Sequence, residues 1–209
     1  MQPDDIRLRG PRVVIRPLRL ADLDEMNTWP ESEDPRYRLF DWSICSPEQN
    51  KFWFDNLLRD PSRVYYAVED ETGRLIGRIS LREIRPHWSA RLGIGFGAHF
   101  VGQGYGTEAL QVFLRYYFEV LGFERMVLDV AAINERAIRC YLHCGFKKTG
   151  EAYRGLYESD NLDFLRQPAY RPLKRFFRLN GPYRQMLYYD MTLEKRDWLA
   201  IQERSEKSE

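Results

Sequence analysis

The sequence has few cysteines, no long apolar run and little net charge, and each of these absences excludes a class of protein. Its three cysteines, Cys45, Cys140 and Cys144, are an odd number, and the last two stand four residues apart, which is neither disulfide-framework nor zinc-ribbon spacing. No apolar run approaches the roughly 18 residues of a membrane-spanning helix. The net charge is +1, so composition gives no reason to expect a nucleic acid or an anionic membrane as partner.

The amino-terminal residues lack the features of a secretory signal. Met1-Gln2-Pro3-Asp4-Asp5 has neither the basic segment nor the apolar segment that such a signal needs. Together with thiols that we expect to be reduced and in the core, this predicts a cytoplasmic protein, and we expect no metal site. The chain has 209 residues, of which 44% are hydrophobic. We therefore expect residues 1–209 to form a single domain with a sizeable core.

The most informative stretch is a glycine-rich loop, Gly102-Gln103-Gly104-Tyr105-Gly106-Thr107. The apolar residues after it recur at the spacing of a helix with one buried face: Leu110, Phe113, Leu114, Tyr117, Phe118 and Leu121. Gly122 then stands where a helix C-cap glycine is typical. A glycine loop before a helix N-terminus offers free N–H groups and the positive end of the helix dipole, which suits a phosphate or pyrophosphate. The alternative is a turn that only redirects the chain.

Two common phosphate-binding motifs fit this loop incompletely. A P-loop needs lysine and then Ser or Thr after its second glycine, and Tyr105-Gly106-Thr107 has no lysine. The dinucleotide fingerprint needs glycine or alanine where Thr107 stands, although Gly102 and Gly104 match its first half. Asp129 follows a short apolar run and could be the ribose-binding acid of such a fingerprint. A nucleotide-binding domain therefore stays an alternative.

A second segment, residues 134–146, predicts a short helix with Asn134 as its N-cap and Gly145 as its C-terminal stop. Asn134, Ala137 and Tyr141 are spaced three and four residues apart, so they share one face of that helix. The small Ala137 leaves room for a slender ligand to pass between an amide and a phenol. The alternative for Tyr141 is an ordinary core position.

Together these two segments resemble the GNAT N-acetyltransferases. The supporting residues are Gly102–Gly106 and the pattern Asn-x-x-Ala-x-x-x-Tyr-x-x-x-Gly-Phe of residues 134–146. The most similar branch is RimJ/RimL-like, that of the ribosomal-protein N-terminal acetyltransferases, in which Gly-Gln-Gly-Tyr-Ala/Gly-Thr-Glu-Ala is typical. The similarity is sharpest over residues 91–146 and vaguer over residues 13–198.

The resemblance implies an α/β (α+β) fold with a central mixed, mostly antiparallel sheet and helices on both faces. In that family one strand splays away from its neighbour and opens a V-shaped slot for the pantetheine arm. Residues 90–96 match the splayed strand, and residues 126–130 match the other side of the slot. Gly93 and Gly95 indicate weak or bulged pairing in the first of these strands.

The resemblance also implies a reaction, the transfer of an acetyl group from acetyl-CoA to a primary amine by direct attack. Tyr141 stands at the position of the general acid that protonates the departing thiolate, and the backbone N–H of Phe96 is the expected oxyanion donor. Acetyl-CoA is the expected co-substrate, with no metal. The residues expected to bind it are Phe96, Ala98, Gly102, Gln103, Gly104, Tyr105, Gly106, Thr107, Asn134, Ala137 and Tyr141.

The group that deprotonates the amine is less clear from the sequence. This branch often has a glutamate where this chain has Arg91, just before Leu92 and Gly93. Glu83 on the preceding strand is our candidate base, and His99 or a water relay are alternatives. Val101 and Ala98 also replace residues usual at their positions, but neither change removes an N–H donor.

The remaining elements follow from local patterns. We expect further strands at residues 12–17, 64–68, 75–84, 147–157 and 186–191, and further helices at 21–29 and 193–203. Another helix should begin after the N-cap Ser46, with Pro47 at its first position and Gln49 completing a capping box. Its expected buried stripe is Phe52, Phe54, Leu57 and Leu58. By resemblance, five aromatic residues are candidates to line the acceptor site, or else to fill the core: Trp29, Tyr37, Phe40, Trp42 and Trp53.

An insertion at about residues 158–184 departs from the family pattern. Over residues 164–184 it has six basic and no acidic side chains, interleaved with aromatic residues: Arg166, Arg171, Lys174, Arg175, Arg178 and Arg184. Such a mixture can bind phosphate and stack on bases, or receive an acidic peptide. We favour a lid or a subunit contact, the latter implying a homodimer. A short polar tail ends the chain.

These observations predict an acetyl-CoA-dependent N-acetyltransferase. A protein N-terminus is the leading acceptor, and a small amine such as a polyamine or an aminoglycoside is the second. The alternative of another class is a non-catalytic acyl-CoA-binding or RNA-associated module, which Arg91 and the basic insertion would favour. We expect no membrane partner.

Overall fold

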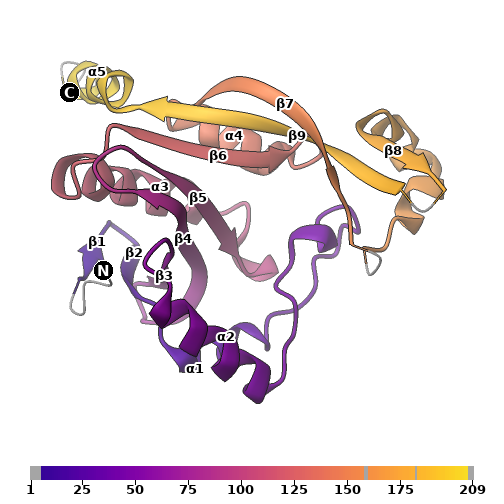
Figure 1. Cartoon of the computed structure of the whole chain (residues 1–209), viewed down its shortest axis with the longest axis horizontal. Helices are drawn as coiled ribbons and strands as arrows, with labels where there is room; N and C mark the ends of the chain where they lie inside the picture. The colour runs from indigo at the N-terminus through magenta and orange to yellow at the C-terminus, as the bar shows by residue number, and fades with distance from the viewer. Residues whose placement is uncertain (1–5, 158–159, 182, 207–209) are drawn as a thin grey trace.

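The computed structural model describes residues 6–157, 160–181 and 183–206, which build one nine-stranded sheet with helices on both faces (Figure 1). The strands are β1 (Leu8–Arg9), β2 (Val13–Pro17), β3 (Val64–Asp70), β4 (Leu75–Arg85), β5 (Ser89–Phe96), β6 (Arg125–Ala131), β7 (Lys147–Gly155), β8 (Phe177–Asn180) and β9 (Tyr183–Glu194). Their order is β1-β2-β3-β4-β5-β6-β9-β7, and β8 pairs with β9. Adjacent strands are antiparallel except β5 and β6, which are parallel. The mixed, mostly antiparallel sheet is thus confirmed.

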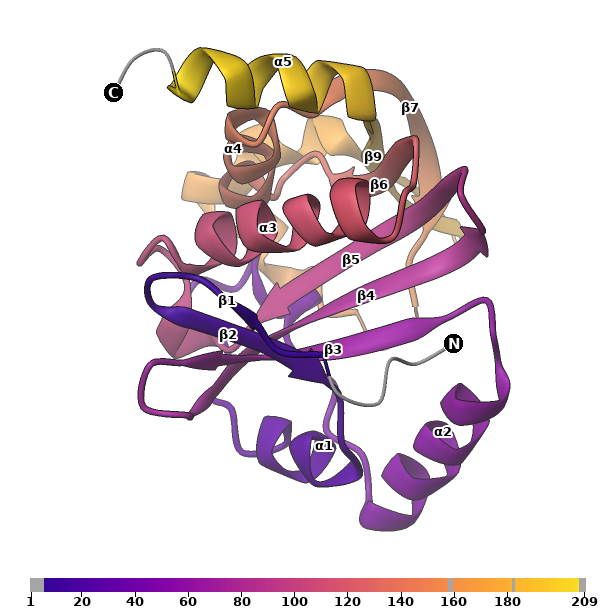
Figure 2. The ribbon, with the colours of Figure 1, turned by 90° about the vertical axis from the view of Figure 1, so that its left-hand side faces the viewer.

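Helices cover both faces of this sheet, as predicted (Figure 2). They are α1 (Leu20–Met26), α2 (Pro47–Arg59), α3 (Tyr105–Arg115), α4 (Glu135–His143) and α5 (Lys195–Glu206). The first two pack on one face through a small cluster that includes Leu23 and Leu57. The other three pack on the opposite face through the main core, where Phe113, Tyr141 and Trp198 are buried. Amphipathic helices of this kind are stable because each buries one apolar stripe against the sheet.

The parallel pair β5/β6 is joined over a short stretch. Ser89–Arg91 pairs with Arg125–Val127, and beyond these residues no pairing continues between the two strands. Each strand then follows its other neighbour, β4 or β9. The two strands therefore splay apart from this junction, as the resemblance implied. The Tyr117 hydroxyl spans the junction, donating to the Arg125 carbonyl at 2.6 Å and accepting from the Ala90 N–H at 2.8 Å.

A buried cluster of charges fastens the first strands to the first helix. Arg16 on β2 donates to both oxygens of Asp22 on α1, at 2.7 and 2.8 Å. It also donates to Glu69 on β3 at 2.5 Å. The side chains of Arg16 and Asp22 are only 7% and 6% exposed. Glu69 has a second partner, the exposed Arg7 at 3.3 Å, so two cations and two carboxylates balance in this cluster.

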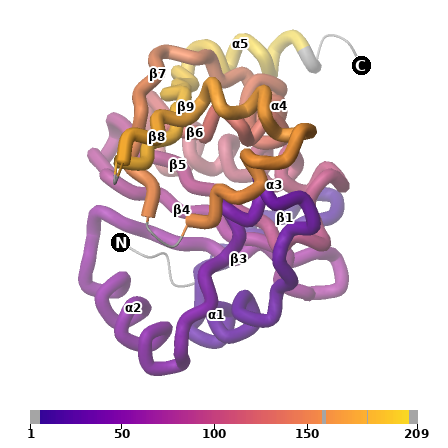
Figure 3. Tube along the Cα trace, turned by 90° about the vertical axis from the view of Figure 1, so that its right-hand side faces the viewer, coloured from indigo at the N-terminus to yellow at the C-terminus, as the bar shows by residue number. Residues whose placement is uncertain are grey.

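The insertion forms two 3-10 helices, Asp163–Arg166 and Pro168–Phe176, followed by β8. Its aromatic and aliphatic side chains pack around Phe164, which is buried, and against Leu39 and Phe40 of the α1–α2 connection. The insertion and the connection thus lie against each other (Figure 3). Five of its six basic residues are exposed, and Arg184 is half-buried: the exposed ones are Arg166, Arg171, Lys174, Arg175 and Arg178.

Local details differ from the sequence predictions at three places. The capping box at Ser46 is confirmed, but Phe52 and Leu58 of the predicted stripe are 73% and 55% exposed, because α2 buries a narrower stripe around Leu57. Strand β1, which precedes the first predicted strand, was not predicted, since two residues are too few for an alternating pattern. The helix after the glycine loop ends in a π-helical turn, Tyr116–Val120. Residues 207–209 of the predicted polar tail lie outside the described residues.

Candidate functional site

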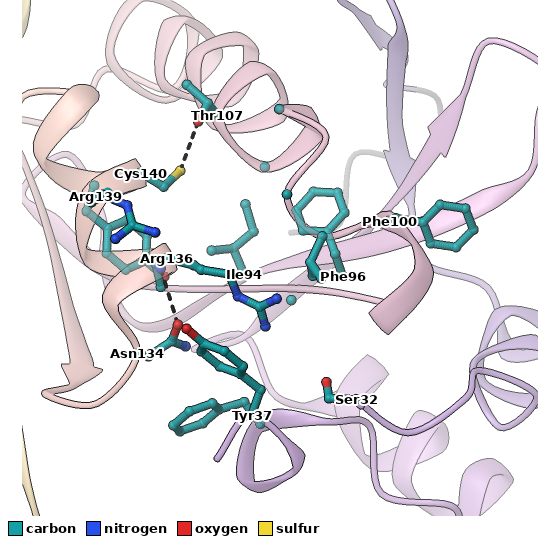
Figure 4. Close-up of a pocket in the computed structure, with 18 of the residues that line it drawn as sticks. Ser32, Tyr37, Ile94, Phe96, Phe100, Thr107, Asn134, Arg136, Arg139 and Cys140 are labelled. Carbon is teal, nitrogen blue, oxygen red and sulfur yellow. Dashed lines mark hydrogen bonds between the residues drawn. The ribbon is translucent and has the colours of Figure 1, made fainter. Parts of the chain in front are cut away.

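A cavity of about 540 Å³ opens where β5 and β6 separate. Its walls come from the glycine loop and the start of α3, the end of β5, the start of α4, and the α1–α2 connection (Figure 4). The two segments singled out from the sequence, residues 102–107 and 134–141, therefore meet at one cavity. The predicted residues that line it are Phe96, Gly102, Gly104, Gly106, Thr107, Asn134, Ala137 and Tyr141.

The glycine loop reaches α3 through two left-handed residues. Gly102 and Gly104 have φ values of +80° and +87°, which a side chain would strain. Gly104 is the N-cap of α3, and no side chain accepts from the N–H groups of the first turn. An uncapped helix N-terminus that lines a cavity is suited to hold an anion. Arg136 and Arg139 of α4 also line this cavity and add positive charge.

Helix α4 places the amide and the phenol as expected. The Oδ1 atom of Asn134 accepts from the Ala137 N–H at 3.2 Å and caps the helix, so its Nδ2 group remains as a donor. Tyr141 is 6% exposed and lies against Phe146. Among the described residues its hydroxyl has no hydrogen-bond partner. Burial raises the pKa of Tyr141 above 10.0, and the nearby Cys140, Asp129 and Cys144 raise it further, so the phenol keeps its proton at neutral pH.

The backbone of β5 directs one N–H group into the splayed region. The N–H of Gly97 donates to the carbonyl of Ile76 on β4 at 3.1 Å. Because N–H groups alternate between the two edges of a strand, the N–H of Phe96 points to the opposite edge, toward β6. At that level β6 no longer pairs with β5. The N–H of Phe96 therefore faces the space between the strands.

Several predicted residues lie outside the main cavity lining. Ala98 lines a smaller neighbouring cavity of about 270 Å³ instead. The Gln103 side chain donates to the His99 carbonyl at 2.6 Å, and the Tyr105 ring stacks under the Arg12 guanidinium. Glu83 and the alternative His99 are also not among the lining residues. Glu83 instead forms an ion pair with Arg91 at 2.9 Å, so its assignment as base stays a prediction without support from this geometry.

Arg91 forms part of a charged cluster in the region between β5 and β6. It donates to Asp129 on β6 at 2.8 Å as well as to Glu83. Arg154 on β7 lies 3.4 Å from the same Asp129 carboxylate. Two carboxylates thus flank the arginine that stands where the family often has a glutamate. Asp129 was considered from the sequence only as a ribose-binding acid, and its distance in sequence from Arg91 gave no signal of this pairing.

The cysteines correct one prediction and add a cavity residue. Of the three, only Cys144 is buried, whereas Cys45 and Cys140 are half-buried. Cys140 lines the cavity, and its Sγ accepts from the Thr107 hydroxyl at 3.4 Å. Hydrogen bonds from Cys144 and Thr107 lower the pKa of Cys140. The apolar character of the predicted helix suggested a core position, and the cavity beside that face could not be seen from sequence.

The sequence also missed the contact that closes one side of the cavity. Arg136 of α4 lies over the Tyr37 ring of the α1–α2 connection, 3.5 Å from its centroid. Tyr37 was predicted among the aromatic residues of the acceptor wall, and it does line the cavity together with Phe40. Trp29 and Trp42 line the neighbouring cavity, whereas Trp53 packs against Tyr65 on the α2 side.

Two properties of the described residues bear on other functional classes. Within residues 6–157, 160–181 and 183–206, no helix has both the length and the apolar character to cross a membrane. In the same ranges no group of three or more His, Cys, Asp or Glu side chains could hold a metal ion.

Comparison with known proteins identifies the family. The sequence profile described as "Acetyltransferase (GNAT) domain" matches residues 12–147. The chain is 24% identical over 173 residues to a spermidine N(1)-acetyltransferase from Vibrio cholerae, covering 82% of this chain and 95% of the relative. It is 28% identical over 127 residues to a Bacillus subtilis protein provisionally named ribosomal N-acetyltransferase YdaF, covering 60% of this chain and 57% of the relative.

A solved structure has the same fold. The crystal structure of spermidine N-acetyltransferase from Vibrio cholerae in complex with CoA and spermine superposes with a TM-score of 0.64 at 23% identity. The match covers 90% of this chain and 98% of that one. With the splayed strands, the uncapped glycine loop and the profile match all on the same residues, the chain belongs to the GNAT acetyltransferases, N-acetyltransferases whose acetyl donor is acetyl-CoA.

Proposed function

We propose that this N-acetyltransferase moves an acetyl group to the primary amine of a peptide N-terminus or a small molecule, by direct attack of the amine. The observation that supports this most is the buried phenol of Tyr141. It lines the cavity, keeps its proton and has no hydrogen-bond partner within the described residues. A buried hydroxyl left without a partner is costly, which is expected where a ligand supplies the partner.

The residues present fit acetyl-CoA. The first-turn N–H groups of α3 and the left-handed Gly102 and Gly104 form a cradle for a pyrophosphate. A Cβ on Gly102 would meet nothing within 4 Å, so the cradle stays open to a ligand. The positive charges of Arg136 and Arg139 suit the phosphates of coenzyme A. The Nδ2 group of Asn134 is free to donate to an amide carbonyl of the pantetheine arm.

Three groups of the chain would act during transfer. Acetyl-CoA supplies an activated acetyl group as a thioester. The N–H of Phe96, facing the space between β5 and β6, would stabilise the negative charge that develops on the carbonyl oxygen. Tyr141 would give its proton to the departing thiolate. The α1–α2 connection, through Tyr37 and Phe40, would hold the acceptor on the opposite side.

The acceptor is best sought in two classes. One relative is named for spermidine, and another for a ribosomal substrate. The first supports a small amine and the second supports the N-terminus of a protein. A RimJ/RimL-like protein acceptor remains our leading candidate from the sequence, and two arginines on β4, considered below, support an acceptor of that kind over a polyamine. Because the three cysteines are free, we also propose the cytoplasm as the compartment.

Replacing Tyr141 by Phe tests the catalytic assignment. We expect kcat to fall by about 10²-fold or more, as for the loss of a general acid. The affinity for acetyl-CoA, measured by calorimetry, should change little, because the ring and its packing on Phe146 remain. The exposed Tyr183 gives a matched control as Tyr183→Phe, with unchanged kcat. An unchanged kcat in Tyr141→Phe would refute the role of the phenol.

A further inference from the structure

The face of the sheet beneath the α1–α2 connection has a strip without side chains on β5. Gly93 and Gly95 pair with Ser80 and Arg78 on β4, and paired residues of adjacent strands share a face. A Cβ on Gly95 would lie 4.0 Å from Nε of Arg78, and one on Gly93 would lie 3.9 Å from Nη2 of Arg82. The guanidinium groups of Arg78 and Arg82 therefore lie over these two glycines.

These two arginines lack the carboxylate partners that nearby arginines have. Across the described residues, neither Arg78 nor Arg82 forms an ion pair or a hydrogen bond through its side chain. Arg78 contacts the Trp42 ring, 5.1 Å from its centroid, and both side chains are half-buried. Burial lowers the pKa of Arg78, as does the positive charge of Arg82. Arg91, directly across from Arg82, is by contrast paired with two carboxylates.

Two acidic side chains of the α1–α2 connection, Asp41 and Glu31, line the cavities, but within the described residues neither forms an ion pair with Arg78 or Arg82. Both oxygens of Asp41 accept from Ser32, at 2.7 Å each. Glu31 lies 3.6 Å from Arg38 and is 76% exposed. Half-buried cations beside one another are unfavourable unless an anion joins them. The two guanidinium groups are therefore suited to bind one carboxylate.

The position of this strip connects it with the acceptor. Gly95 lines the main cavity and directly precedes Phe96, the proposed oxyanion donor. Trp42, on which Arg78 stacks, lines the neighbouring cavity together with Phe96 and Gly97. Neither arginine is itself among the residues that line the two cavities, but Nε of Arg78 lies 4.0 Å from the place of a Cβ on Gly95, which puts this guanidinium directly behind the cavity wall.

We propose that Arg78 and Arg82 bind a carboxylate of the acceptor, so that the substrate is an α-amine with a carboxylate close by rather than a polycation. This rests on the function proposed above. The carboxylate comes either from an acidic side chain next to a peptide N-terminus or from a free amino acid. The same positive charges favour the neutral, nucleophilic form of the amine, and this is easiest for an α-amino group, with an ordinary pKa of about 7.7–8.0 against about 10.4 for an alkyl amine such as that of lysine.

Binding to the CoA-loaded protein tests this without turnover. Calorimetry would compare a hexapeptide that begins Ser-Glu with one that begins Ser-Gln, free glutamate and spermidine. We expect the Ser-Glu peptide or glutamate to bind about tenfold or more tightly than the Ser-Gln peptide, as for a charge-assisted hydrogen bond. Tighter binding of the Ser-Glu peptide would identify a peptide as the acceptor, and tighter binding of glutamate would identify a free amino acid. Spermidine should bind more weakly than either.

Substitutions locate the charge. Arg78→Met and Arg82→Met should each abolish the preference for the acidic ligand, while Arg85→Met, at the exposed end of the same strand, should leave it intact. Equal affinity of the wild-type protein for the Ser-Glu and Ser-Gln peptides, or tighter binding of spermidine, would overturn the proposal even if the variants fail to fold. A separate acetylation assay reports on the proposed function: absence of acetyl transfer from acetyl-CoA to every amine tested would refute that function, whereas the preference for the acidic ligand is measured by binding alone and does not depend on turnover.

Discussion

At the scale of single residues, the hydrogen bonding and the protonation of the site residues depend on neighbours that are distant in sequence. Asn134, Ala137 and Tyr141 could be placed on one helix face from their spacing, and Gly102 to Gly106 could be assigned a phosphate-binding shape. The state of these groups could not be predicted in the same way. That Tyr141 lacks a partner, or that Thr107 donates to Cys140, depends on how α3 and α4 meet.

The raised pKa of Tyr141 gives a prediction for the dependence of kcat on pH. Because burial favours the neutral phenol, the acid form persists as pH rises and is lost only above the ordinary value of 10.0. We expect kcat to rise as the amine of the acceptor loses its proton and then to stay constant up to about pH 10. A profile of kcat between pH 6 and pH 10.5 checks this. An alkaline fall centred near pH 8.5 that Tyr141→Phe removes would contradict the assignment.

At the scale of elements, capping residues and apolar periodicity predicted most helices and strands. How these elements pack and pair could not be predicted from such local patterns. The capping box of Ser46 and Gln49 lies where predicted because both partners are three residues apart. The stripe of α2 was only partly right, since Phe52 is apolar but faces solvent. Nothing in the sequence of either strand indicates that β5 and β6 pair over only three residues. The splay of the two strands was therefore predicted from the family resemblance and not from the residues themselves.

Tyr117 allows a test of the junction between β5 and β6. Tyr117→Phe would leave the Ala90 N–H and the Arg125 carbonyl without their shared hydrogen-bond partner. The ring itself is buried and would stay in place. We expect a loss of about 1–3 kcal/mol in the free energy of unfolding, measured by denaturant titration. The affinity for acetyl-CoA should also fall, because the cradle on α3 and the N–H of Phe96 diverge from this junction. Stability like that of the control Tyr183→Phe would show that the hydroxyl contributes nothing.

At the scale of the whole molecule, a buried cluster of charges joins the sheet to its first helix. The cluster of Arg16, Asp22 and Glu69 joins β2, α1 and β3 in a region shielded from solvent. Its partners are separated by up to 53 positions in the chain. These three ion-pair partners therefore could not be matched from the sequence alone.

Arg16→Met should destabilise the protein by about 3–5 kcal/mol, because it leaves the buried carboxylate of Asp22 without its cation and leaves Glu69 with only the exposed Arg7 as partner. Urea titration of the variant measures this. The control is Arg63→Met, since the pair of Arg63 with Asp60 is 52% and 37% exposed and such pairs contribute about 0–1 kcal/mol. Similar losses in the two variants would mean that the buried cluster is no stronger than a surface pair.

The three-residue contact between β5 and β6 makes the catalytic geometry sensitive to small rotations. Phe96 lies five positions beyond Arg91, the last residue of β5 that pairs with β6, which is about 17 Å of strand at about 3.3 Å per residue. At the end of such an arm, a tilt of about 3–4° moves the peptide group by about 1 Å, a displacement that can cost about 10²-fold in rate. Substitutions around residues 89–91 and 125–127 should therefore alter turnover by tilting β5, although these residues do not line either cavity.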